Sequence, residues 1–274
     1  MDVNYNATNG TDVWSQTPGK KGLSGSTLKM IAIVTMFIDH VGAAVVGRMM
    51  MYGGLASVNG DSTATMQWLM QNGNLYTIYM VMRFIGRVAF PIFCFLMIQG
   101  FEHTHDRRKY AFRLGLFAII SEVPFDLAFN SEILEFSYQN VFFTLFIGLL
   151  TMWVCDTVDK KQEWNRVLRV LLMIVITAAG MGIAKLLKTD YDATGVFCIM
   201  VLFFTRKNKI QQIVAGCVSF FWELTAPLAF IPIGFYNGKR GWKMKYFFYI
   251  FYPAHLLLLY GICYIMGISQ YPAV

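Results

Sequence analysis

The sequence predicts an all-α protein, a polytopic membrane helix bundle with about eight to ten transmembrane helices. Hydrophobic residues make up 56% of the 274 residues and charged residues only 14%, against about 25% in a typical soluble domain. The mean hydropathy is +0.49, and the apolar residues gather in runs long enough to form spanning helices. These runs do not follow the strict alternation of a transmembrane β-barrel.

The apolar runs give the order of the elements. Residues 1–27 are polar and contain Gly, Ser, Thr and Asn throughout, which predicts a disordered cytoplasmic tail before a single membrane domain over residues 28–270. The sixth run is short for a full crossing. The seventh contains Glu223, Pro227 and Pro232 and is either one kinked helix or two short pieces. We expect spans at about 28–51, 78–101, 112–129, 139–158, 167–187, 192–205, 210–232 and 246–268.

Clusters of Lys and Arg predict the orientation. They precede the first span and follow the second, fourth and sixth, and none occurs from Met49 to Met82 or from Leu114 to Asp159. Because basic loops stay on the cytoplasmic side, we expect a multi-pass protein of the cell membrane (plasma or inner) with a cytoplasmic N-terminus. The Lys239–Lys245 loop would lie outside in an eight-span arrangement. Either the seventh run doubles back or this loop breaks the rule.

The basic loops also bear on partners. One interpretation is topology and contact with membrane lipid. The other is a cytoplasmic site for a phosphorylated ligand, because guanidinium and ammonium groups pair with phosphates. Nucleic acid is not an expected partner, since the sequence offers no folded domain to hold it.

An Asp-His pair lies near the middle of the first span. Asp39 and His40 are the only ionisable residues between Lys29 and Arg48, and a charge at such depth costs roughly 2.5–3.5 kcal/mol. Lys29 precedes His40 by eleven positions, close to three helical turns, so both side chains share a face roughly 16 Å apart. Asp39 points about 100° away from His40, so it cannot be assumed to orient that ring.

Two further polar pairs lie in the second and third spans. Arg83 and Arg87 are one turn apart, as are Glu122 and Asp126, with Pro124 between the two acids. Buried arginines need anions or a water-filled cavity nearby. The pairs therefore predict either a buried Arg–carboxylate lattice that sets helix register or a preorganised polar cavity that accepts a substrate, and the two interpretations are compatible.

Of the three remaining histidines, one is an alternative to His40 as the catalytic residue, and the other two form a weak candidate for a metal site. His255 lies near the centre of the last span, just after Pro253, where a histidine is either a satisfied core residue or a catalytic group. His103 and His105 are two positions apart and do not share a helix face, so no metal site is expected. The five cysteines lie in or at the ends of apolar spans and are expected to be small buried hydrophobic residues.

Several segments of the chain resemble the TraX family, which takes its name from the enzyme that N-acetylates F-type conjugative pilin. The resemblance runs from about residue 26 to 268 and is most specific from Arg83 to Arg113 and at the two ends. The segments that carry it are LKMIAIVTMFIDHVG, RFIGRVAFPIFCFLMIQGFEHTHDRRKYAFRL, SEVPFDLAF, NVFFTLFIGLL, TDYDATGV and YNGKRG followed by KYFFYIFYPAHLLLLY.

A wider resemblance is to acyltransferase-3-type membrane acyltransferases, which carry a basic residue, ten intervening positions and a histidine on their first helix. Lys29 and His40 fit that spacing. The resemblance implies that residues 28–270 form an acyltransferase-like domain that moves an acyl group from cytoplasmic acetyl-CoA to an acceptor at or beyond the membrane. Acetyl-CoA is then a co-substrate, and no metal is expected.

The resemblance implies roles for His40, for Lys29 on the donor path and for Arg107, Arg108 and Arg113 near the CoA phosphates, and the buried polar residues suggest the others. His40 would be the catalytic base that removes a proton from an acceptor amine or hydroxyl, and an acyl-histidine intermediate is an alternative. Arg83 or Arg87 would stabilise developing negative charge. The catalytic candidates are His40, Asp39, Asp126, Glu122 and His255. The candidates for binding acetyl-CoA are Lys29, Arg83, Arg87, Arg107, Arg108 and Arg113.

The acceptor and two rival functions stay open at this point. The acceptor is a pilin-like protein N-terminus, a glycan, a cell-wall polymer or a peptide. One rival function is a transporter or proton-coupled carrier that uses the buried Arg, Asp, Glu and His groups as a translocation path, which would favour internal symmetry. The other is a non-catalytic membrane assembly factor, which would tolerate the loss of His40.

Overall fold

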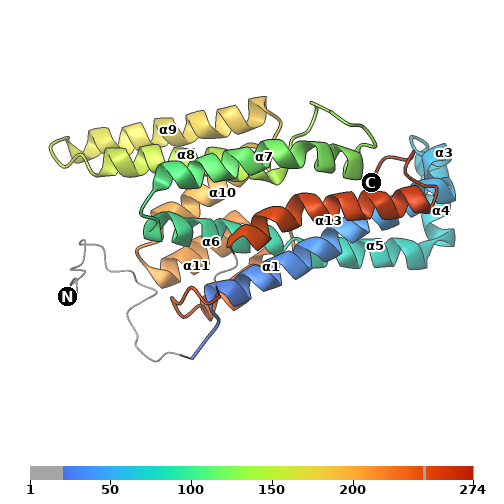
Figure 1. Ribbon diagram of the computed structural model, residues 1–274, viewed down its shortest axis with the longest axis horizontal. Helices are drawn as coiled ribbons and strands as arrows, with labels where there is room; N and C mark the ends of the chain where they lie inside the picture. The colour runs from blue at the N-terminus through green and yellow to red at the C-terminus, as the bar shows by residue number, and fades with distance from the viewer. Residues whose placement is uncertain (1–20, 243–244, 274) are drawn as a thin grey trace.

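The computed structural model describes residues 21–242 and 245–273 and confirms the all-α helix bundle (Figure 1). Of the expected tail, residues 1–20 lie outside the described part. The larger helices, in chain order, are α1 Gly25–His40, α4 Ser62–Gln71, α5 Gly73–Gly86, α6 Ala89–His103, α7 Arg107–Phe129, α8 Val141–Asp159, α9 Arg166–Leu186, α10 Asp192–Phe204, α11 Lys209–Ser219 and α13 Lys245–Ile265. The shorter elements are η1 Val41–Val46, α2 Gly47–Met50, η2 Met51–Leu55, α3 Ala56–Val58, η3 Ala226–Ala229 and α12 Phe230–Gly234.

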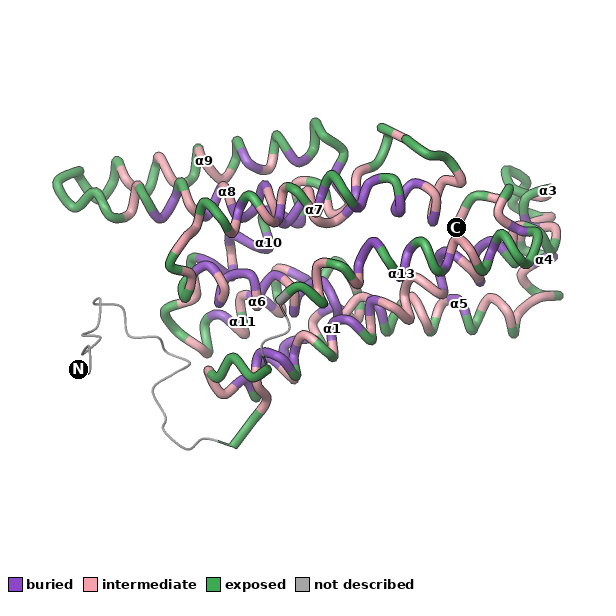
Figure 2. Tube along the Cα trace, in the orientation of Figure 1, coloured by how far each residue is buried: buried purple, intermediate pink, exposed green. Residues whose placement is uncertain are grey.

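Five helical segments in the described chain are long and apolar enough to cross a membrane. They are Gly25–Val58, Gly73–His103, Val141–Asp159, Arg166–Leu186 and Tyr246–Ile265. The fourth of these, α9, is the most exposed, and Figure 2 shows it along one edge of the molecule. Its exposed side chains are apolar, among them Leu171, Ile174 and Val175. Such a face suits lipid rather than water, which supports a membrane protein.

The first segment runs from α1 to α3 and is kinked at Gly54, whose φ of 105° is not helical. Ser24 begins it, because its hydroxyl oxygen accepts the Thr27 N–H at 3.2 Å. The α-helical hydrogen bonding widens to a π-helix at Val41, immediately after His40. Such π turns insert an extra residue and are frequent at functional sites. His40 is therefore the last residue of regular helix before the irregular turn.

The next segment is interrupted between α5 and α6. Pro91 has no N–H to donate to the carbonyl of Arg87, so regular helical bonding cannot pass through this point. The hydroxyl of Thr225, from a distant part of the chain, donates to the Phe84 carbonyl at 2.6 Å beside the break. The break thus gives another element access to the middle of this span.

The short helix α10 lies at the centre of the main core. Its residues Val196, Cys198, Ile199 and Leu202 are fully buried, and it packs against α8, α9 and α11. At its start, Tyr191 stacks on Phe90 of α6, with ring centroids 3.6 Å apart. The sixth apolar run is short because its helix serves as a packed core element.

The seventh run doubles back. A turn at residues 220–225 and η3 join α11 to α12, and the chain returns alongside α11. Lys209 at the start of α11 donates to the Gly234 carbonyl at the end of α12, at 2.7 Å. The following loop returns to the start of α1, where the N–H groups of Gly25 and Ser26 donate to the carbonyls of Lys239 and Arg240 at 2.8 and 3.0 Å. Of the two alternatives for this run, the structure shows the re-entrant one.

The re-entrant segment gathers the basic loops at one end of the bundle, called the basic end here and lying toward the left in Figure 1. The basic end comprises the start of α1 and the loops at residues 104–106, 160–165, 205–208 and 235–242. The loop that conflicted with an eight-span arrangement therefore lies with the others. This distribution of charge agrees with the positive-inside rule.

Candidate active site

A cavity of about 520 Å³ lies among α1, α6, α7, α8 and α13 and reaches the basic end. None of the Asp or Glu residues that the structure describes lines it. Its polar lining residues are Lys29, Gln99, His103, Thr104, His105, Tyr110, Arg113, Tyr236, Arg240, Tyr249 and Tyr252. Its apolar lining residues include Ile33, Met36, Phe93, Leu96, Met97, Leu114, Val141, Phe142, Leu145 and Phe248. The cavity is therefore suited to an anionic ligand with an apolar portion.

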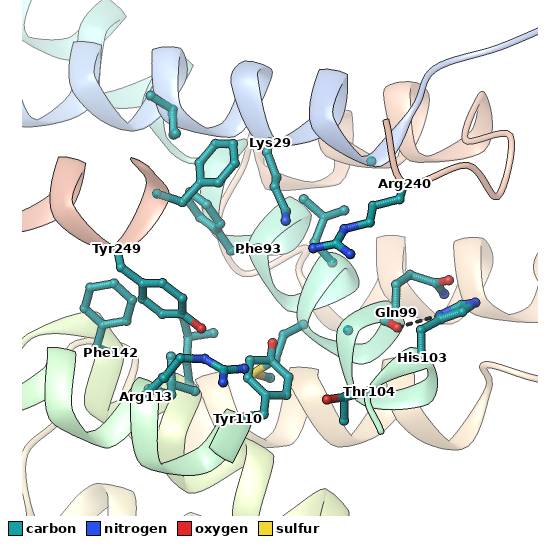
Figure 3. A pocket seen from close by; sticks show the side chains of 18 of the residues that line it. Lys29, Phe93, Gln99, His103, Thr104, Tyr110, Arg113, Phe142, Arg240 and Tyr249 are labelled. Carbon is teal, nitrogen blue, oxygen red and sulfur yellow. Dashed lines mark hydrogen bonds between the residues drawn. The ribbon is translucent and has the colours of Figure 1, made fainter. Parts of the chain in front are cut away.

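The cations and the apolar side chains are arranged around one space (Figure 3). Lys29 and Arg240 extend into it from one side, and Arg113 extends from the opposite side beside Tyr110 and Tyr249. The Lys29 ammonium lies 5.0 Å from the centre of the Phe248 ring, and the Arg113 guanidinium lies 5.9 Å from the centre of the Tyr110 ring. Aromatic faces hold cations in this way without neutralising them.

Two residues that line the cavity lie next to His40. Met36 lines the cavity and precedes His40 by one helical turn. Tyr252 also lines the cavity, and its ring centre lies 5.9 Å from that of His40. From α1, Lys29, Ile33 and Met36 line the cavity, whereas His40, one turn further along this helix, is not among the lining residues.

His40 and His255 form a hydrogen-bonded pair. Nδ1 of His40 lies 2.7 Å from Nε2 of His255, and Nδ1 of His255 lies 2.7 Å from the carbonyl oxygen of Phe251. A carbonyl oxygen only accepts, so His255 carries its proton on Nδ1. With both rings neutral, Nε2 of His255 accepts from Nδ1 of His40. His40 is then left with a lone pair on Nε2, which is the tautomer that a general base needs.

Asp39 faces away from the histidines and joins both arginines of the second span. Its carboxylate accepts from Arg83 at 2.7 Å and from Arg87 at 3.2 Å, and Arg87 also pairs with Glu223 at 3.0 Å. Asp39 packs against Gly86, where an added Cβ would lie only 2.1 Å from the Asp39 Cβ. An Arg–carboxylate lattice is present, but its acids are Asp39 and Glu223 of the re-entrant turn and not Glu122 and Asp126.

Glu122 and Asp126 lie on another side of the bundle. Glu122 accepts from the side chain of Asn140, the N-cap residue of α8, and Asp126 accepts from the Glu135 N–H at 2.9 Å. Both acids therefore hold the 130–140 loop and the start of α8. Neither forms an ion pair with Arg83 or Arg87 in the described part of the chain.

The other arginines predicted to bind the donor have separate positions. Arg107 pairs with Asp156 of α8 and lies over the Phe101 ring, and Arg108 is exposed on α7. Of the predicted donor-binding residues, Lys29 and Arg113 line the cavity. In the described chain, no three His, Cys, Asp or Glu side chains gather where they could hold a metal ion.

A second polar cluster lies beside the start of α10, outside the spanning helices. The hydroxyl of Tyr138 donates to the carboxylate of Asp190. Burial of this carboxyl group raises the pKa of Asp190 to about 6. The charges of Arg87 and Asp39 also act on Asp190, so the cluster adjoins the lattice around Asp39.

Three residues of the site were not assigned to it from the sequence, namely Arg240, Glu223 and Tyr252. Arg240 belongs to the loop whose charge conflicted with an eight-span topology, and that conflict was the available signal. Glu223 was visible as an acid in a run with two prolines. Tyr252 lies among many aromatic residues of α13, and the sequence contains no feature that separates it from lipid-facing neighbours.

Comparisons with known proteins give one family and two relatives. The family model described as TraX protein matches residues 24–263. The chain is 27% identical over 267 residues to a probable fimbrial assembly protein, FimC of serogroup H1, from Dichelobacter nodosus, covering 86% of this chain and 94% of that protein. It is 23% identical over 190 residues to an uncharacterized protein of Rickettsia prowazekii, covering 69% of this chain and 58% of that protein. No solved structure matches.

Proposed function

Because the chain belongs to the TraX family, we propose that it is an integral membrane acetyltransferase. It transfers an acetyl group from cytoplasmic acetyl-CoA to an amine or hydroxyl of an acceptor at or beyond the membrane. The name of the Dichelobacter nodosus relative, a probable fimbrial assembly protein, favours a pilin-like protein among the candidate acceptors. The basic end faces the cytoplasm in this proposal, as the positive-inside rule requires.

One observation carries the proposal: a hydrogen-bonded histidine pair adjoins Tyr252, which lines the basic cavity. Lys29, Arg113 and Arg240 line the cavity, as does Met36, one helical turn before His40. The cavity has the properties that a CoA thioester needs, namely cations for phosphates and an apolar path for an uncharged arm. The acyl group would reach His40 once the Met36 and Tyr252 side chains turn aside.

The chain's residues then perform a direct acyl transfer. Nε2 of His40 takes the proton from the acceptor amine or hydroxyl as that atom attacks the thioester carbonyl carbon. A bond to the acceptor forms, the carbon–sulfur bond breaks, and the thiolate of CoA leaves and is protonated from His40. His255 holds His40 in the required tautomer through the 2.7 Å contact between their ring nitrogens. His255 is therefore a positioning residue.

The arginine lattice would supply guanidinium N–H donors near this point, although its two arginines are balanced by Asp39 and Glu223. Arg83 uses one N–H group on Asp39, whereas Arg87 is committed to Asp39, Glu223 and the Arg83 carbonyl. Arg83 and Arg87 both act electrostatically on His40. The remaining N–H groups of Arg83 would stabilise the oxyanion that develops on the carbonyl oxygen, with Asp39 fixing the direction of the guanidinium.

The test uses protein reconstituted in liposomes with isotopically labelled acetyl-CoA and a membrane extract as the source of acceptor. We expect the wild-type protein to form a labelled product that mass spectrometry identifies. We expect the His40→Ala variant to form none of this product. Val34→Ala, on the exposed face of α1, is the control and should keep it. If label is never transferred while a solute crosses the vesicles without acetyl-CoA, the protein is a transporter and the proposal is wrong.

A further inference from the structure

We infer that Lys29, Arg113 and Arg240 form one phosphate-binding subsite at the mouth of the cavity. The identity of the ligand rests on the proposed function: the subsite takes the phosphate groups at the nucleotide end of CoA. Arg240 is its key member, because it comes from a loop that neither spans the membrane nor adjoins the other two cations in sequence.

Three separate elements bring these cations together. Lys29 is on α1, Arg113 is on α7, and Arg240 is on the loop between α12 and α13. Figure 3 shows all three extending toward the same space. Cations so placed repel one another, and the charge of Arg240 acts on the Lys29 ammonium. A protein that holds them together without an acid has a place for an anion from outside.

The contrast with the other arginines supports this interpretation. Arg83, Arg87, Arg107, Arg169 and Arg206 each form an ion pair with a carboxylate of the chain.

In the described chain, no carboxylate forms an ion pair with any of the three cavity cations, and no acid lines the cavity. Nε of Arg113 is moreover buried without a hydrogen-bond acceptor. Such a buried donor costs free energy unless a ligand accepts from it.

The loop that carries Arg240 is fixed to the start of α1. The Arg240 carbonyl accepts from the Ser26 N–H at 3.0 Å, and the Trp242 N–H donates to the Ser26 hydroxyl at 3.1 Å. Gly241 between them has a φ of 71°, and a Cβ there would lie 2.0 Å from the Ser26 hydroxyl oxygen. The position of Arg240 relative to Lys29, one turn further along α1, is therefore set by the backbone.

The chemistry of the lining distinguishes a phosphate from other anions. Beyond the cations, the cavity becomes apolar and aromatic, with Phe93, Leu96 and Phe142 on its walls. A ligand that fills both parts has a multiply charged head and an uncharged chain. Either CoA or an anionic phospholipid has this form, so the experiment has to separate the two sources of phosphate.

The experiment measures binding of two probes, CoA and pantetheine, to the purified full chain in phosphatidylcholine nanodiscs. In parallel, mass spectrometry measures how much phosphatidylglycerol stays bound to protein purified from membranes that contain it. Pantetheine keeps the uncharged arm of CoA and lacks all its phosphates. We expect Arg240→Gln to weaken CoA binding by about tenfold or more, as for a lost charge-assisted hydrogen bond, and to leave pantetheine binding unchanged. Arg240→Lys should retain part of the affinity. Lys239→Gln removes a neighbouring charge that does not line the cavity, and it should change neither affinity.

Several outcomes would overturn the inference. If Arg240→Gln leaves CoA affinity unchanged, or if Lys239→Gln weakens it equally, no such subsite exists. If Arg240→Gln abolishes retention of phosphatidylglycerol while CoA affinity stays the same, the site belongs to a lipid. CoA binding by the wild type in either case leaves the proposed function standing. If the wild-type protein fails to bind CoA at all, both the inference and the proposed function are wrong. Thermal unfolding of each variant shows whether it is folded.

Discussion

The packing of Asp39 against Gly86 gives a prediction whose size follows from the structure. In Gly86→Ala, the new Cβ would lie 2.1 Å from Cβ, 2.2 Å from Oδ1 and 2.4 Å from Cγ of Asp39. A normal carbon–carbon contact is about 3.5 Å or more, so α1 and α5 must separate by about 1 Å or Asp39 must leave its position. Cβ is attached to the backbone and cannot rotate away, so both helices are affected.

The expected loss of stability combines two effects. Overpacking a well-packed contact costs about 1–3 kcal/mol. The shift also lengthens the contacts of Asp39 with Arg83 and Arg87, now 2.7 and 3.2 Å, in a network whose side chains are 13–27% exposed. Weakening this partly buried network adds about 1 kcal/mol or more. We therefore expect Gly86→Ala to lower the free energy of unfolding by about 2–4 kcal/mol.

The assay is reversible unfolding in mixed detergent micelles. Gly182→Ala on α9 is the matched control, since nothing lies within 4 Å of its added Cβ. Alanine there should stabilise the helix by up to about 1 kcal/mol. If Gly86→Ala is as stable as Gly182→Ala, the close contact between α1 and α5 and the role of Asp39 in it are wrong.

Two further predictions follow from buried polar groups elsewhere. Arg48 is fully buried and donates to carbonyls of Ala44, Leu127 and Tyr271 and to the Ser131 hydroxyl. Arg48→Gln should lower the free energy of unfolding by about 3 kcal/mol and release residues 268–273. The release would appear as faster hydrogen exchange at Ala273, whose N–H donates to the Phe129 carbonyl. Unchanged exchange at Ala273 would contradict this role of Arg48. For Asp190, the folded pKa is raised to about 6, above its ordinary 3.8, so its favourable contribution is present below about pH 3.8 and is lost as pH rises through 6. Asp190→Asn should therefore raise the melting temperature at pH 7.5 relative to wild type and not at pH 4, and an equal change at both pH values would refute the shift.

The bundle was predictable because membrane helices leave a strong local signal. The first span was placed at 28–51 and the structure has it at Gly25–Val58, and the span placed at 139–158 is α8 at Val141–Asp159. Hydropathy alone could not show that residues 210–232 double back, because each half looks like part of one span. The positive charge of the loop at Lys239 indicated the reversal, because a basic loop is expected on the cytoplasmic side.

The site was only partly predictable for a similar reason. Helical spacing placed Lys29 and His40 on one face, and the structure places a cavity along that face. Buried charges such as Arg83 and Arg87 had to find partners, but the choice of Asp39 and Glu223 over Glu122 and Asp126 depends on how distant helices pack. The contact between His40 and His255 joins residues 215 positions apart, and no local pattern encodes it.

The rate of labelled acetyl transfer by His40→Ala and His255→Ala, measured side by side in reconstituted protein, tests the central claim most directly. If His40 is the base and His255 positions it, His40→Ala should lower the rate of acetyl transfer by about a hundredfold or more. His255→Ala should lower this rate by less. The opposite result, with full transfer by His40→Ala and none by His255→Ala, would contradict the assignment of the base.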